Sequence, residues 1–262
     1  MKAKLTVIKP ESLSNVPVLE VRDVSIYFDT AVASGHVLKT VCFSAMANQI
    51  TCIIGRSGCG KTTLLNVLAG FLTPSSGSVL INGETVRGPG TDRCVVFQED
   101  TLFPWLTVRE NIEFGLTRRV TNRHDRNSRV DRMLTLVGLL SYQHYLPREI
   151  SGGMKQRVEL ARVLILEPQV LLMDEPFASL DYYTRREMQN LLIDLWQQHR
   201  QTILFVTHDI DEAITLADRI LVMNSEPGSI REDLPASFAR PRTVENPECV
   251  LLRRNLYDIL CS

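Results

Sequence analysis

The sequence predicts an α/β fold built around a mostly parallel β-sheet. Short apolar runs rich in β-branched residues alternate along the chain with longer segments whose apolar residues have helical spacing. Gln49–Gly55 and Val170–Met173 are the clearest apolar runs, and such runs are typical of strands covered on both faces. Because strands and helices alternate, each strand is expected to lie parallel to its neighbours.

The composition narrows the class of protein. Of the 262 residues, 44% are hydrophobic and 23% are charged, which excludes a largely disordered chain, a collagen and a mucin-like stalk. The formal net charge is −1, whereas proteins that bind nucleic acid usually carry a basic excess. We therefore expect a globular protein without a nucleic-acid partner.

The elements follow in order along the chain. Further strands are expected at Val18–Phe28, Ser78–Asn82, Cys94–Gln98, Thr202–Thr207 and Arg219–Met223. Helical spacing marks Thr62–Leu72, the segment around residues 130–137 and the segment around residues 188–196. A last helix is expected after Asn246, because a capping residue, a proline and an acid follow one another there.

These elements suggest a division of the chain into three parts. Residues 1–17 are polar and predict a mobile tail, and residues 18–225 form the main domain. Within that domain, residues 101–160 predict a mostly helical insertion. Residues 226–262 form a short extension that ends in a helix.

Membrane and export signals are not expected. No window holds 18 uncharged apolar residues, and the start of the chain lacks the apolar core of a secretory signal. The six cysteines have neither CxxC spacing nor the spacing of metal ligands. We interpret them as reduced thiols of a cytosolic protein that mainly fill apolar space.

The segment Gly55–Thr62 (GRSGCGKT) matches the phosphate-binding pattern G-x-x-x-x-G-K-[ST] between a predicted strand and a predicted helix. In this pattern backbone N–H groups and the start of the helix surround a phosphate, the lysine reaches the outer phosphates and the hydroxyl binds Mg²⁺. The residues expected to contact the nucleotide are Gly55, Ser57, Gly58, Cys59, Gly60, Lys61, Thr62 and Thr63.

A second nucleotide motif ends the strand at Val170–Met173. Asp174 and Glu175 follow it directly, at the edge of a parallel sheet where ligands bind. Asp174 is placed to hold Mg²⁺ through water, and Glu175 is the candidate general base for the attacking water.

With the segment Ile150–Val158 (ISGGMKQRV), the chain resembles the ATP-binding-cassette (ABC) ATPases, of which this segment is the signature. Further positions resemble other motifs of that family. Gln98 resembles its Q-loop glutamine, Asp181 its D-loop, His208 its switch histidine and Phe28 the aromatic residue that stacks on adenine. These motifs span most of the chain.

The resemblance implies a P-loop NTPase (RecA-like) core with a mostly parallel sheet, an antiparallel β subdomain and an inserted helical signature subdomain. It also implies a head-to-tail homodimer, in which ATP bound by one subunit is closed in by Ser151, Gly152, Gly153 and Asp181 of the other. It assigns catalytic roles to Glu175, His208 and Gln98. It assigns Mg²⁺ binding to Thr62, Gln98 and Asp174.

The segment Gln98–Asn111 (QEDTLFPWLTVREN) is similar to the nitrate/sulfonate/taurine group of importers within that family. That likeness implies separate transmembrane permease subunits, indirectly a solute-binding protein, and a peripheral place on the cytoplasmic face of the inner membrane. The chain departs from the family pattern at Met154, where a glutamine is usual. We expect a working site with a changed contact near the ribose.

Several alternatives remain open at this stage. Leu102–Trp105 could line a cleft for a helix of the membrane subunit or belong to the core of the insertion. The six arginines of Arg118–Arg132 could face anionic lipid or form a solvated helix face. The chain as a whole could instead be a soluble ATPase that serves an assembly scaffold, or a regulatory cassette that binds ATP without turnover.

Overall fold

The computed structural model describes residues 17–29, 34–117, 119–243 and 245–261. The predicted N-terminal tail therefore lies outside the described residues, apart from Pro17, which begins a strand rather than ending the tail. The strands are β1 (Pro17–Asp29), β2 (Ser34–Met46), β3 (Ile50–Ile54), β4 (Ser76–Ile81), β5 (Glu84–Thr85), β6 (Arg93–Val96), β7 (Val170–Asp174), β8 (Thr202–Thr207), β9 (Arg219–Asn224) and β10 (Ser229–Pro235).

The helices lie between these strands. They are α1 (Lys61–Ala69), α2 (Val108–Glu113), α3 (Arg123–Leu136), α4 (Gly152–Leu164), α5 (Tyr182–His199), α6 (Ile210–Leu216) and α7 (Pro247–Cys261). Within the described residues, no helix combines the length and the apolar character needed to cross a bilayer.

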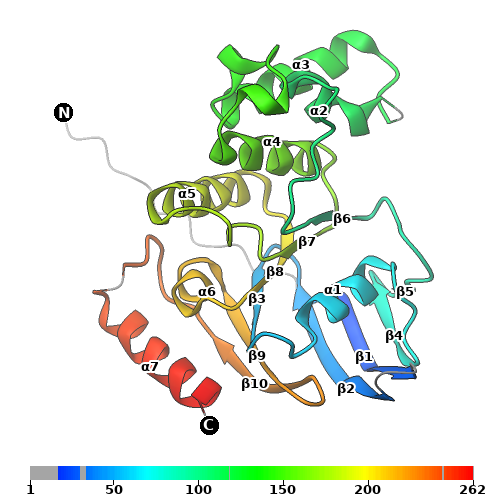
Figure 1. The fold of residues 1–262 in the computed structure, drawn as a ribbon, viewed down its shortest axis with the longest axis vertical. Helices are drawn as coiled ribbons and strands as arrows, with labels where there is room; N and C mark the ends of the chain where they lie inside the picture. Colours follow the sequence, from blue (N-terminus) through cyan, green and yellow to red (C-terminus); the bar gives the residue numbers. More distant parts are fainter. Residues whose placement is uncertain (1–16, 30–33, 118, 244, 262) are drawn as a thin grey trace, which may run out of the picture.

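A mixed six-stranded sheet forms the centre of the molecule, with the strand order β10-β9-β3-β8-β7-β6. The strands from β9 to β6 are parallel, as predicted from the alternation of strands and helices, and β10 pairs with β9 antiparallel. A second, antiparallel sheet has the order β2-β1-β4-β5. Figure 1 shows this second sheet beside α1, and the helices α2, α3 and α4 at the opposite end of the molecule.

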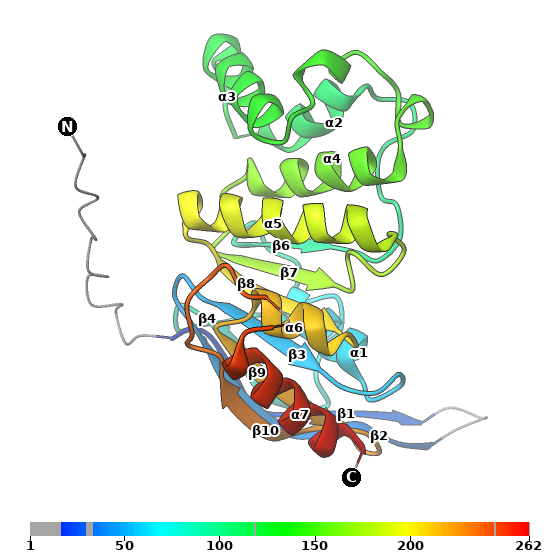
Figure 2. The same cartoon turned by 90° about the vertical axis from the view of Figure 1, so that its left-hand side faces the viewer.

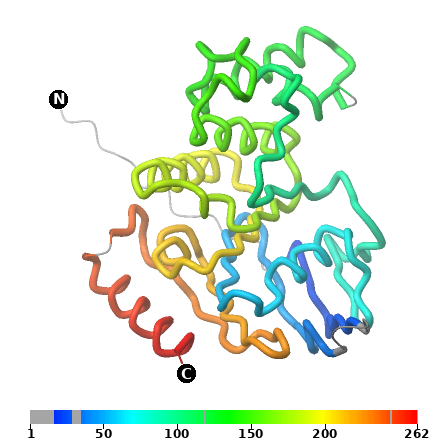
Figure 3. Tube along the Cα trace, in the orientation of Figure 1, coloured from blue at the N-terminus to red at the C-terminus, as the bar shows by residue number. Residues whose placement is uncertain are grey.

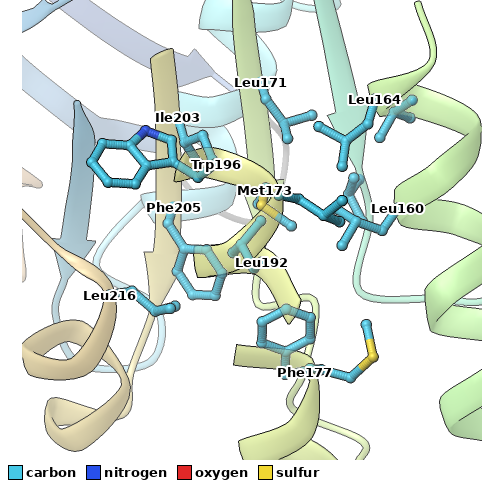
Figure 4. Close-up of a cluster of buried hydrophobic side chains, with 14 of the residues drawn as sticks. Leu160, Leu164, Leu171, Met173, Phe177, Leu192, Trp196, Ile203, Phe205 and Leu216 are labelled. Carbon is cyan, nitrogen blue, oxygen red and sulfur yellow. The ribbon is translucent and has the colours of Figure 1, made fainter. Parts of the chain in front are cut away.

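Two apolar clusters hold these layers together. One packs α4 and α5 against the central sheet, and Figure 4 shows its centre, which includes Trp196 of α5, Met173 of β7 and Phe205 of β8. The other packs α1 between the two sheets. Because both clusters include residues of β7 and β8, these central strands are covered on both faces, as their unbroken apolar runs predict.

The segment after residue 225 is part of the same body. β10 extends the central sheet, and α7 packs beside α6 (Figures 2 and 3). α7 begins where the sequence predicts, and the Asn246 side chain accepts a hydrogen bond from the Glu248 N–H at 3.0 Å. The sequence analysis did not predict β2, β5, β10 or α6.

Candidate functional site

The phosphate loop connects β3 to α1 and surrounds a cavity of about 540 Å³. Gly60 precedes α1 with a φ of 95°, and a Cβ at this position would lie 2.8 Å from Leu38. The first turn of α1 has no side-chain cap and no acidic residue. Its free N–H groups and the helix dipole therefore suit an anion in the cavity.

Lys61 is buried at the base of this loop. Its ammonium group donates hydrogen bonds to the carbonyl oxygens of Gly55 at 2.9 Å and Arg56 at 3.1 Å. It also lies 3.7 Å from a carboxylate oxygen of Glu175. The lysine thus links the two residues at the start of the phosphate loop and places its ammonium group beside the candidate general base.

Glu175 and His208 meet at the opposite wall of the cavity. The second carboxylate oxygen of Glu175 lies 2.7 Å from His208 Nδ1. Glu175 has a φ of 44°, in the left-handed region that non-glycine residues seldom occupy. Its backbone N–H donates to the carbonyl of Val206, which holds this strained residue at the edge of the sheet.

Asp174 and Thr62 form the candidate metal position. Burial raises the pKa of the Asp174 carboxyl, and a hydrogen bond from the Thr62 side chain opposes that rise. A hydroxyl oxygen and a carboxylate oxygen are ligands that suit Mg²⁺, and Gln98 adds an amide group to the lining of the same cavity. The residues present therefore fit a magnesium ion.

The structure gathers most of the predicted nucleotide residues around this cavity. Its lining includes Ser57, Gly58, Gly60, Lys61, Thr62, Thr63, Gln98, Glu175 and His208. Gly55 and Cys59 lie behind the loop instead, where a Cβ on Gly55 would come within 2.6 Å of the Cys59 sulfur. Burial raises the pKa of the Cys59 thiol, so this side chain packs as an apolar group.

The predicted signature and D-loop residues line a separate hollow of about 490 Å³, whereas Asp174 lines neither hollow. Ser151 caps α4 and accepts a hydrogen bond from the Met154 N–H at 3.3 Å, and Asp181 caps α5. Gly152 and Gly153 lie beside Ser151 in the lining. Among the described residues none lines both hollows, so one copy of the chain does not bring the two halves of the predicted site together.

Phe28 is not among the residues that line either hollow, and its side chain is partly exposed near the end of β1. Val37, on the neighbouring strand β2, does line the phosphate-loop cavity, although the sequence analysis did not select it. The alternation of buried Val41, Phe43 and Ala45 is the signal that could have identified β2.

The segment after Gln98 separates into a buried and an exposed part. Leu102 belongs to the core, whereas Trp105 is 72% exposed. The Phe103 ring lies 5.7 Å from Trp105 and 4.5 Å from Phe114, which is also exposed. These three rings form an aromatic surface beside α2.

The arginine-rich stretch, residues 118–132, contains both hydrogen-bonded and exposed arginines. Arg118 lies outside the described residues. Arg119 donates to two backbone carbonyls, and Arg126 pairs with Glu113 at 2.5 Å. The other arginines of α3 are exposed, namely Arg123, Arg129 and Arg132.

Known proteins are similar to this chain in sequence. The ABC transporter family model matches residues 38–178. The chain is 44% identical over 230 residues to the nitrate import ATP-binding protein NrtD of Synechocystis sp., covering 88% of this chain and 86% of that protein. It is 46% identical over 207 residues to the taurine import ATP-binding protein TauB of Sinorhizobium fredii, covering 79% of this chain and 78% of that protein.

Two solved structures resemble the fold. cbiO1 from Clostridium perfringens, part of the ABC transporter complex cbiONQ, has a TM-score of 0.75 and 28% identity, with 84% of this chain and 89% of that chain covered. A dimeric post-hydrolysis state of the ATP-binding cassette MJ0796, bound to ADP and Pi, has a TM-score of 0.73 and 27% identity, with 84% and 100% covered. This chain therefore belongs to the ABC transporter family and is an ABC-type ATPase.

Proposed function

We propose that this chain is the ATP-hydrolysing subunit of a membrane importer for a small, anionic solute of the nitrate, sulfonate or taurine kind. The single observation that carries the importer proposal is the similarity to NrtD and TauB, which extends over more than three quarters of each of those proteins. The partners would be a second copy of the chain and separate permease subunits. A solute-binding protein would deliver the solute to the permease. The chain would then act at the cytoplasmic face of the inner membrane.

The geometry of the phosphate-loop cavity supports specific roles. The start of α1 and Lys61 would bind the phosphates. Phe28 lies outside the cavity lining and is proposed to stack on adenine from the family resemblance alone. Glu175 would take the proton of the attacking water, while His208 and Gln98 would orient the reacting groups. Thr62, Gln98 and Asp174 would hold Mg²⁺, which neutralises phosphate charge when bound.

The separation of the two hollows supports a dimer. Ser151, Gly152, Gly153 and Asp181 lie in one hollow, and the phosphate loop lies in the other. A head-to-tail arrangement would bring each signature hollow to the partner's nucleotide. The N-terminus of α4, like that of α1, would then point positive potential at phosphate. ATP would hold the dimer closed, and hydrolysis would release it.

The aromatic surface of Phe103, Trp105 and Phe114 supports contact with a permease. Trp105 and Phe114 are exposed and Phe103 beside them is half-buried, and such a group of rings is unusual on a surface that faces only water. The surface begins five residues after Gln98, so a partner docked there would be close to the nucleotide cavity in the chain.

The test uses the variant Glu175→Gln, purified from native membranes with Mg-ATP. We expect this variant to bind ATP without hydrolysing it, to form a stable dimer and to retain a polytopic membrane protein. Glu84→Gln, an exposed carboxyl on β5, is the matched control and should hydrolyse ATP normally. Recovery of Glu175→Gln only with a non-membrane scaffold would overturn the importer proposal, and a monomer with Mg-ATP would overturn the dimer.

A further inference from the structure

A cluster of buried polar side chains lies behind the exposed His208. The His208 side chain is 60% exposed, yet the residue before it, Thr207, is only 2% exposed. Glu212 on α6 and Gln189 on α5 are 5% and 4% exposed. None of the three takes part in the chemistry proposed above, and a buried carboxyl group is costly unless it is hydrogen-bonded.

Both oxygens of the Glu212 carboxyl are hydrogen-bonded. The Thr207 hydroxyl donates to one oxygen at 2.6 Å, and the Gln189 amide donates to the other at 3.2 Å. The Thr207 hydroxyl oxygen in turn accepts the backbone N–H of Asp209 at 3.0 Å. Since Thr207 donates to Glu212 and accepts from Asp209, the residues on both sides of His208 are bound in one directed chain of hydrogen bonds.

Asp209 is fixed from a second direction. One of its carboxylate oxygens accepts the N–H groups of Asp211 at 2.8 Å and Glu212 at 3.2 Å, which caps α6. The other lies 3.4 Å from the Arg185 guanidinium. Arg185 and Gln189 are one turn apart on α5, so a single helix face contacts the side chains of both Asp209 and Glu212.

Helices α5 and α6 lie side by side near the end of β8 (Figures 1 and 2). α5 begins at the cap Asp181, in the signature hollow, and Arg185 also donates to the carbonyl of Leu180 at 2.9 Å. The hydrogen bonds of this cluster therefore connect the signature hollow of one copy with the catalytic wall of its own phosphate-loop cavity.

We propose that Glu212 is a positioning residue that fixes the backbone of His208 through Thr207, and thereby places His208 Nδ1 against Glu175. The proposal rests on the proposed ATPase role of the cavity. A shift of the His208 backbone would leave a buried carboxylate oxygen or a buried hydroxyl without a hydrogen-bond partner. An unpaired buried polar group of this kind costs free energy. A small buried polar network thus holds the backbone of a residue whose exposed side chain contacts Glu175.

The decisive variant is Thr207→Val, which keeps the shape of a buried strand residue and removes only the hydroxyl. We expect kcat for ATP hydrolysis to fall by about 10- to 100-fold, because misplacing a reacting group by a small distance has effects of this size. KM for ATP should change less than about twofold, since the phosphate loop is untouched. Thr207→Ser retains the hydroxyl and should keep kcat within about threefold of the wild type.

Two further measurements separate positioning from a general loss of structure. In a His208→Ala background, Thr207→Val should have no additional effect on the residual rate, because both changes act through the same side chain. The imidazole NMR signals of His208, identified by their loss in His208→Ala, should move in Thr207→Val and stay in place in Thr207→Ser. If Thr207→Val does not fold, Glu212→Gln is measured in its place.

Three results would overturn the proposal: an unchanged kcat in Thr207→Val, an effect that adds to His208→Ala, or unchanged His208 signals. The NMR comparison does not require turnover. If the wild-type chain failed to hydrolyse ATP, the proposed function would fall, and the His208 signals would still decide whether Glu212 and Thr207 position this residue.

Discussion

Arg242 fastens the C-terminal segment to the central domain, and its removal should cost much more than an ordinary surface substitution. The guanidinium is 4% exposed and donates to the carbonyls of Ile214 at 2.7 Å and Phe238 at 3.0 Å, as well as to those of Ala217 and Ala236. Burial, with the nearby Arg240 charge, lowers the pKa of Arg242 to about 10.

The cost of Arg242→Met follows from these contacts. The methionine fills much of the volume of the stem but leaves four carbonyl oxygens without their shared donor. At about 1–3 kcal/mol for each orphaned buried acceptor, the gross loss is about 4–12 kcal/mol. Relief from burying a charge offsets several kcal/mol of this. We expect a net loss of about 3 kcal/mol in the free energy of unfolding, or about 6–10 °C in Tm.

Urea unfolding followed by circular dichroism measures this loss, with an unchanged m-value as evidence that the unfolding transition is the same. Arg254→Met is the matched control, because Arg254 is an exposed arginine on α7. The control should change stability by less than about 0.5 kcal/mol. A loss below about 1 kcal/mol in Arg242→Met would refute the view that this side chain joins the segment to the domain.

Three shorter predictions concern the nucleotide cavity and the helical insertion. Lys61→Ala should abolish measurable ATP binding and hydrolysis in calorimetric and phosphate-release assays, and wild-type turnover would contradict the assignment of the phosphate loop. Phe28→Ala should weaken ATP binding by about 1–3 kcal/mol, the usual value of base–aromatic stacking, and unchanged affinity would place adenine elsewhere. Thr107→Ala should lower stability by about 1 kcal/mol at pH 7, because Thr107 caps α2. Hydrogen bonds from Thr107 lower the pKa of Glu110, so the stability gained from that carboxylate exists above its unfolded pKa and is lost as the pH falls through the folded pKa. The difference between wild type and Thr107→Ala should therefore shrink in acid, and a constant difference would argue against the capping box.

The sequence predicted best those strands that the fold buries on both faces. β8 begins and ends at the predicted residues, Thr202 and Thr207, because a strand covered on both sides needs an unbroken apolar run. β10 was missed because its three charged residues, Arg231, Glu232 and Asp233, have the character of a loop. At the edge of a sheet such residues face water, so the local sequence does not distinguish the two cases.

In the candidate site, the sequence likewise predicted best the features that depend on neighbouring residues. The phosphate loop is local, so its spacing alone predicted most of the cavity lining. The pairing of Glu175 with His208 joins residues 33 positions apart, and the buried contact between Thr207 and Glu212 depends on how α6 leaves the sheet. The first contact depends on the pairing of β7 with β8, and the second depends on α6, which the sequence analysis did not include. No local spacing rule predicts either contact.

The charged strand β10 also bears on how copies of this chain can associate. Without it, the buried residues Ile220, Leu221 and Val222 of β9 would form an apolar edge with unpaired backbone groups, which readily recruits strands from other molecules. β10 covers that edge with charged side chains, and at the other edge β6 spans only four residues. Growth of the central sheet from one molecule into the next is therefore disfavoured at both ends. Strand pairing therefore competes little with association of copies through other faces, such as the faces that carry the two hollows.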